Sequence, residues 1–139
     1  MCLKCGKLVH CEIAEKAQQL QSELQQFIGT TQYYQYMAGL KLTDGVKYLA
    51  DNAGGGAYWL LDILASYQCE PKIGREYFQV WELQLLPRAE GNENAQPAVV
   101  TMKADTTELV RQEIMHTDFP LDYIKLYLID GVILLTSEY

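Results

Sequence analysis

The sequence has no long apolar run and no segment that resembles a secretory signal. Although 49% of its 139 residues are hydrophobic, no stretch approaches the ~20 consecutive apolar residues that a membrane-spanning helix requires. The N-terminus becomes polar and charged within about a dozen residues, without the apolar core of ~7–15 residues that a secretory signal carries. We therefore expect a cytoplasmic protein that does not bind membranes.

Basic residues are scarce, with 11 Lys and Arg against 18 Asp and Glu and a formal net charge of -7. Non-specific binding of nucleic acid requires a basic surface that displaces counterions from the phosphates. The charge balance therefore argues against direct nucleic-acid binding and favours a protein partner, above all one with a basic surface. The sequence leaves the oligomeric state open, so a homo-oligomer is compatible with it.

The sequence also lacks the short motifs that carry a recognisable chemistry. It contains no Gly-x-x-x-x-Gly-Lys phosphate loop, no Gly-x-Ser-x-Gly nucleophile turn and no His-Glu-x-x-His zinc motif. No enzymatic activity can be identified on this basis. A non-enzymatic binding or adaptor role is the default interpretation.

The first half of the chain has the apolar spacing of helices. Over residues 12–28 the apolar positions recur every three or four residues, which is typical of a helix with one buried face. Either Thr43 or Asp44 can cap a second helix, which a run of three glycines at 54–56 ends. A third helix is expected at about 57–67. Two short extended segments, 33–36 and 40–42, lie between the first two helices.

The second half changes to the period of two that strands show. Residues 76–136 contain five such runs, and the Asp130-Gly131 pair between the last two is a strong signal for a hairpin turn. We expect a single domain spanning residues 1–139, with a Cys/His-rich extension at 1–11, a mainly helical part at 12–68 and antiparallel strands at 76–136. The predicted class is α+β, with N-terminal helices packed on a C-terminal antiparallel sheet of about five strands.

Three of the four cysteines and one of the two histidines lie within the first eleven residues. Cys2 and Cys5 have the two-residue spacing of half a zinc knuckle, and His10 and Cys11 could supply the remaining ligands. Adjacent ligands strain the chain, however, so Cys69 or a second subunit could replace one of them. A tail without metal is the plain alternative. Zinc binding is thus a hypothesis. On that hypothesis the protein would be a small module that a zinc ion at its N-terminus holds together.

Two acidic residues and a histidine are candidates for a ligand-binding or catalytic pocket. His116 and Asp118 alternate onto one side if their strand continues, so that the carboxylate could orient the imidazole. Asp118 could equally cap a turn before Phe119-Pro120. Asp62 is a carboxylate in an otherwise apolar helix. The simpler interpretation is that it lies on the one solvent-exposed face of that helix.

Tyrosines and a helix start are candidates for binding. Tyr33, Tyr34 and Tyr36 could stack on bases or form a protein-binding patch, and an acidic protein favours the second use. Asp44 lies where a helix N-terminus could hold an anion, but its own carboxylate already occupies that positive end.

Five segments together resemble one family. They are QFIGT at 26–30, LTDGVKYLA at 42–50, AYWLLD at 57–62, TDFPL at 117–121 and SEY at 137–139. The chain from about residue 24 to 139 resembles a family of small bacterial proteins that is catalogued only as a domain of unknown function, with members on chromosomes, plasmids and phages. The triple glycine is longer than the Ala-Gly of the family, and the Cys-rich start lies outside the shared region.

The resemblance implies no activity, and no catalytic residue can be carried over from it. If the gene lies on a phage or plasmid, the acidic charge suggests an inhibitor of a host defence complex that occupies a basic groove. That function is a hypothesis that depends on charge and resemblance alone.

Overall fold

The computed structural model describes residues 8–88 and 96–139, with side chains from residue 15 onward. Four α-helices, seven strands and two short 3-10 helices are assigned within these ranges. In chain order they are α1 (Leu8–Gln25), β1 (Tyr34–Gln35), η1 (Met37–Gly39), β2 (Lys41–Leu42), α2 (Asp44–Asn52), α3 (Tyr58–Tyr67), α4 (Pro71–Gly74), β3 (Phe78–Leu85), β4 (Ala98–Ala104), β5 (Thr107–Ile114), β6 (Tyr123–Ile129), β7 (Val132–Leu135) and η2 (Thr136–Glu138).

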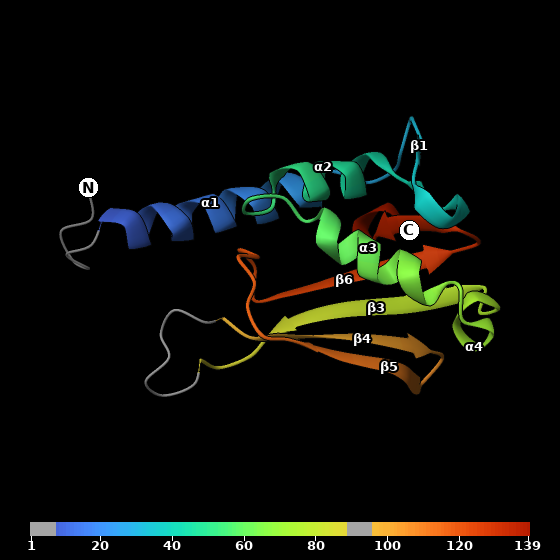
Figure 1. The fold of residues 1–139 in the computed structure, drawn as a ribbon. Helices are drawn as coiled ribbons and strands as arrows, with labels where there is room; N and C mark the ends of the chain where they lie inside the picture. The colour runs from blue at the N-terminus through green and yellow to red at the C-terminus, as the bar shows by residue number, and fades with distance from the viewer. Residues whose placement is uncertain (1–7, 89–95) are drawn as a thin grey trace.

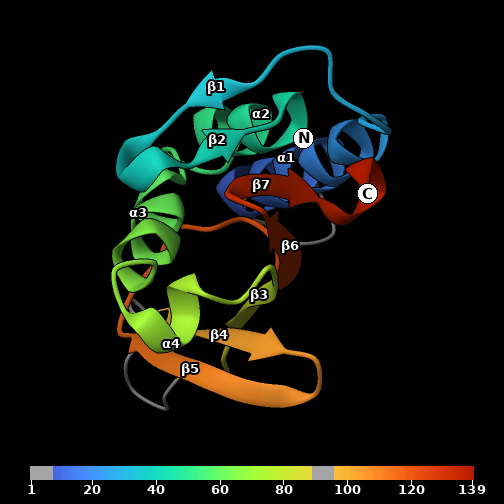
Figure 2. The same cartoon turned by 90° about the vertical axis from the view of Figure 1, so that its right-hand side faces the viewer.

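One twisted sheet carries the fold, with helices on one of its faces. The strand order is β1-β2-β7-β6-β3-β4-β5. Helices α1, α2 and α3 lie above the sheet (Figure 1). The strands from β7 to β5 form an arc, and α3 and α4 lie on the inner side of it (Figure 2). The predicted α+β class is therefore confirmed.

Two parts of the fold prediction were wrong. The sheet has seven strands within the described residues, more than the five or so expected, because the short segments β1 and β2 join it. β2 pairs with β7 in parallel, and the Lys41 amide donates to the Gly131 carbonyl at 2.9 Å, so the sheet is not wholly antiparallel. Nor are the helices all N-terminal, since α4 begins at Pro71 and η2 lies near the C-terminus.

The core lies between the helices and the inner face of the sheet. In β3 every second residue is buried, namely Gln79, Trp81 and Leu83, and these positions face the helices. Helix α2 buries its apolar stripe, and Val46 and Leu49 are fully enclosed. Burial of such apolar area, at about 25 cal/mol per Å2, is the main favourable term in folding.

One polar side chain, Gln79, is completely buried within this core. Its amide nitrogen donates to the carbonyl of Ile73 at 3.0 Å and to that of Glu76 at 3.1 Å. Its amide oxygen accepts from Trp81 Nε1 and from Gln68 Nε2, each at 2.9 Å. Gln79 thereby ties α4, the end of α3 and the centre of the sheet together, and its polar atoms are satisfied.

The start of α2 is closed by residues from the far end of the chain. Thr43 caps the helix by accepting from the Val46 amide, as its sequence position predicted. Glu138 then accepts from the Thr43 hydroxyl at 2.6 Å, from the Leu135 amide at 3.0 Å and from the Gly45 amide at 3.2 Å. A Cβ on Gly45 would lie 2.5 Å from Leu135 Cδ1 and 2.6 Å from Glu138 Oε1, so a larger residue here would displace the ends of both side chains.

Candidate functional site

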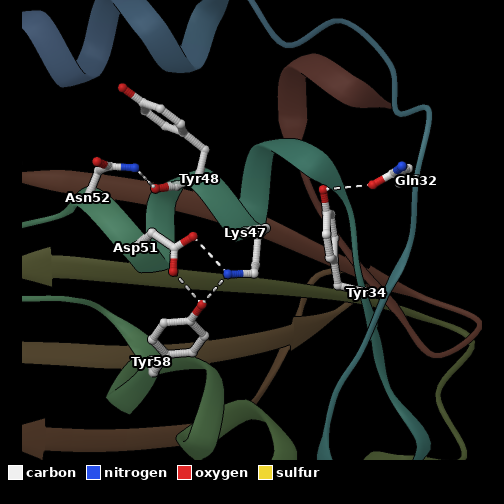
Figure 3. Close-up of polar contacts among 7 residues, drawn as sticks. All are labelled: Gln32, Tyr34, Lys47, Tyr48, Asp51, Asn52 and Tyr58. Carbon is white, nitrogen blue, oxygen red and sulfur yellow. Dashed lines mark hydrogen bonds and ion pairs between the residues drawn. The ribbon is translucent and has the colours of Figure 1, made fainter.

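A group of polar side chains joins α2 to the start of α3. The Lys47 ammonium donates to Asp51 at 2.8 Å and to the Tyr58 hydroxyl at 2.9 Å, and the same hydroxyl donates to Asp51 (Figure 3). Lys47 Nζ also lies 5.9 Å from the ring centre of Tyr34 and 5.6 Å from that of Tyr58, within the range of a cation–π contact. The hydrogen bond to Asp51 raises the pKa of Lys47 well above its usual range. Lys47 therefore stays charged and is neutralised within the cluster.

A second tyrosine–carboxylate pair lies beside the first. The Tyr36 hydroxyl donates to Asp62, and its ring stacks on that of Tyr58 with the centroids 6.2 Å apart. Burial, followed by the bond to Asp62, raises the pKa of Tyr36 far above its usual value. Asp62 itself is exposed on α3, in agreement with the interpretation that it lies on the solvent-exposed face of this helix.

Asp44 anchors the segment that precedes β1. Its carboxylate accepts from the Thr31 amide at 2.8 Å and from the Thr31 hydroxyl at 3.0 Å, while the Asp44 amide donates to Thr30 Oγ1. The bond from the Thr31 amide is the main cause of a lowered pKa at Asp44. The carboxylate thus occupies the positive end of α2, as its sequence position suggested.

An Asp44→Asn variant should be less stable than the wild type at neutral pH and equal to it in acid. Because the folded pKa of Asp44 lies below the ordinary 3.8, its contribution is complete above that value and is lost as the pH falls through the folded pKa. Urea midpoints measured from about pH 6 to pH 2 test this expectation. Asp105→Asn, at an exposed turn, is the control. If the urea midpoints of Asp44→Asn and wild type differ by the same amount at every pH, the expectation is contradicted.

We call residues Tyr34, Tyr36, Asp44, Lys47, Asp51, Tyr58 and Asp62, which the contacts above connect, the tyrosine face. Tyr33 precedes it in the chain. Tyr33 is 58% exposed, and the nearby Met37 is 53% exposed. Three carboxylates stand on this face against a single cation, Lys47, which Asp51 neutralises. Such a face can offer aromatic rings and carboxylates to a positively charged group.

A cavity of about 570 Å3 among the described residues is lined by both His116 and Asp118. β5 ends at Ile114, so the two residues stand on the segment beyond it. His116 Nδ1 accepts from the Gln96 amide at 3.1 Å, and Asp118 accepts from the Gly55 amide at 2.8 Å. Asp62, the third candidate of the predicted pocket, lies instead on the tyrosine face.

The predicted zinc ligands are mostly beyond what the structure describes. Cys2 and Cys5 lie outside the described residues, and His10 and Cys11 fall in α1 before its side chains are described. Cys69 is exposed. Within the described part of the chain no group of three or more His, Cys, Asp or Glu side chains could hold a metal ion. Zinc at the N-terminus stays a prediction.

None of the described helices is both long and apolar enough to cross a bilayer.

Sequence reasoning missed the central members of the tyrosine face. Lys47 and Asp51 stand four residues apart on α2, and this spacing is a usable signal for an ion pair on one helix face. Tyr58 joins them because the loop through Gly54 and Gly56, both at positive φ, returns the chain to α2. The arrangement of that loop had no local signal beyond its glycines.

Comparison with known proteins gives one match. A protein-family model described as a family of unknown function (DUF6876) matches residues 18–139. No curated protein and no solved structure matches the chain. The match contains the whole tyrosine face and begins after the Cys/His cluster, so the zinc hypothesis concerns residues outside the matched region.

Proposed function

The chain belongs to this family of unknown function, and we propose that it is a non-enzymatic binding protein whose tyrosine face receives a cationic segment of a partner protein. The observation that carries the proposal is the placement of Asp44, Asp51 and Asp62 among tyrosine rings on one face, where the lone cation is already paired. The partner that fits has exposed arginine or lysine side chains.

The fixed geometry of the tyrosines supports this role. Tyr36, Tyr58 and Tyr34 are each held by hydrogen bonds or ring contacts, so binding costs little further side-chain entropy. Tyrosine is enriched at protein interfaces because it offers a large rigid ring with a polar tip. The pairing of each hydroxyl with a carboxylate or amide oxygen also keeps the rings oriented without a partner.

The negative net charge of the protein supports a positively charged partner. A net charge of -7 speeds the encounter with basic surfaces and slows the encounter with acidic ones. An arginine brought to the face can contact a tyrosine ring and a carboxylate together, a combination that lysine makes less well because it lacks the planar guanidinium. Proteins that handle nucleic acids have such basic surfaces, and inhibition of a defence complex would be one form of this function.

The test is a titration of isotope-labelled protein with an oligo-arginine peptide, followed by NMR. We expect saturable shifts at the amides of the tyrosine face, and an Asp62→Asn variant should bind several-fold more weakly. Asp105→Asn removes another exposed carboxylate, from the β4–β5 turn, and should bind as the wild type does. Equal weakening by the two variants would indicate attraction to net charge alone and would refute the proposal.

A further inference from the structure

We propose that the 570 Å3 cavity beside His116 binds a small zwitterion with an apolar body, of the class of a dipeptide with apolar side chains. The inference goes beyond the proposed function, because the cavity and the tyrosine face have no residue in common. It brings together α1, the glycine loop between α2 and α3, and the segments that follow β3 and β5.

The size and floor of the cavity suit an apolar body. Small-molecule sites usually enclose about 300–1,000 Å3 and are lined mainly by apolar side chains. Leu20 and Phe119 are buried at 5% and 3% exposure and line this cavity, together with the half-buried Leu85. An apolar side chain of a ligand placed against them would have its own surface removed from water, at about 25 cal/mol per Å2.

The charged groups around the cavity come in both signs. Lys16 and Arg88 carry positive charge, and Asp118 and Asp122 carry negative charge. Among the described residues, groups of both signs therefore line one cavity, and a ligand that carries both charges can contact each of them. A zwitterion can meet carboxylate with cation and ammonium with carboxylate in charge-assisted hydrogen bonds.

Two backbone contacts hold the polar groups in place before a ligand arrives. Because His116 Nδ1 accepts from the Gln96 amide, the neutral ring has its proton on Nε2, which is the donor that remains for a carboxylate. Asp118 is fixed by the Gly55 amide, and a Cβ on Gly55 would lie 2.9 Å from its Oδ2. The glycine therefore permits the close approach that fixes this carboxylate beside the cavity.

The experiment titrates the labelled protein with the dipeptide leucyl-phenylalanine, observed by NMR. We expect saturable shifts of the amides of Gly54, Gly55 and Phe119. The same dipeptide with an acetylated amino end and an amidated carboxyl end should bind about tenfold more weakly, since both charges are gone. Glycylglycine, which keeps the charges and lacks the apolar body, should also bind at least about tenfold more weakly.

Matched variants tie the binding to this cavity. Lys16→Gln and Asp122→Asn, both at exposed positions, should each lower the affinity several-fold, whereas Lys72→Gln on α4 and Asp105→Asn should not. Equal binding of the blocked dipeptide would overturn the zwitterion, and the absence of saturable shifts up to about 10 mM would overturn the site. Shifts at the tyrosine face instead would overturn this inference while leaving the proposed function standing.

Discussion

A Gln79→Leu variant should lose about 3 kcal/mol of its free energy of unfolding, because a leucine satisfies none of the polar groups that Gln79 bonds. The substitution leaves Trp81 Nε1 and the Glu76 carbonyl without the bond from Gln79. The Ile73 carbonyl keeps its bond from the Glu76 amide at 3.0 Å. Each orphaned buried group costs about 1–3 kcal/mol, which exceeds the gain from a more apolar side chain. For a domain with a total stability of about 5–15 kcal/mol, this is a large fraction.

Urea denaturation followed by tryptophan fluorescence and by far-ultraviolet circular dichroism measures this loss. The matched control is Gln84→Leu, which makes the same chemical change on the same strand at an exposed position. We expect the control to unfold within about 0.5 kcal/mol of the wild type. If both variants lose the same stability, the buried amide network is not the cause.

The second large effect is expected at Glu138. A Glu138→Ala variant should lose about 2 kcal/mol, because the Thr43 hydroxyl and the amides of Gly45 and Leu135 lose their acceptor at once. Glu70→Ala is the control, since Glu70 precedes α4 without a side-chain capping bond. Chemical denaturation should show a clearly lower free energy of unfolding for Glu138→Ala than for Glu70→Ala.

A double-mutant cycle attributes the loss to the contact between Glu138 and Thr43. Thr43→Ala and Glu138→Ala remove the two ends of one hydrogen bond, so the double variant should be less destabilised than the sum of the singles, by about 1 kcal/mol. Additivity within about 0.3 kcal/mol would mean that the two residues stabilise α2 independently.

Features of the fold that depend on local chemistry were predictable from the sequence. Asp130 and Gly131 adopt the positive φ values, 49° and 79°, that a two-residue hairpin turn of this kind demands. Thr43 caps α2 where its position indicated, and glycines 54 and 56 take positive φ at the end of that helix. In each case the conformation is set by residues within a few positions of one another.

Features that depend on distant parts of the chain were not predictable. Two-residue strands such as β2 have no period to detect, and the pairing with β7 depends on a partner about ninety residues away. Gln79 alternates correctly into the core, but no pattern of polarity predicts a buried amide. Its place there depends on acceptors from α4 and a donor from Trp81.

The candidate sites show the same difference between local and distant determinants. His116 and Asp118, two residues apart, were expected to stand near each other, and the structure places both at one cavity. Asp62 was grouped with them on chemistry alone, and helix packing carries it to the tyrosine face beside Tyr36. The neighbours of Asp62 depend on the direction in which α3 leaves the glycine loop. That direction cannot be predicted from the sequence.

The bond between Thr43 and Glu138 joins residues 95 positions apart, and this separation has a kinetic consequence. Closing a loop of that length costs chain entropy before any contact repays it, so structures rich in such contacts fold slowly. Helix α2 can form its later turns locally, but its first turn is completed only when the distant segment returns. Opening of that turn should therefore accompany rupture of the β2–β7 pairing, making this end of the sheet one cooperative unit in hydrogen exchange.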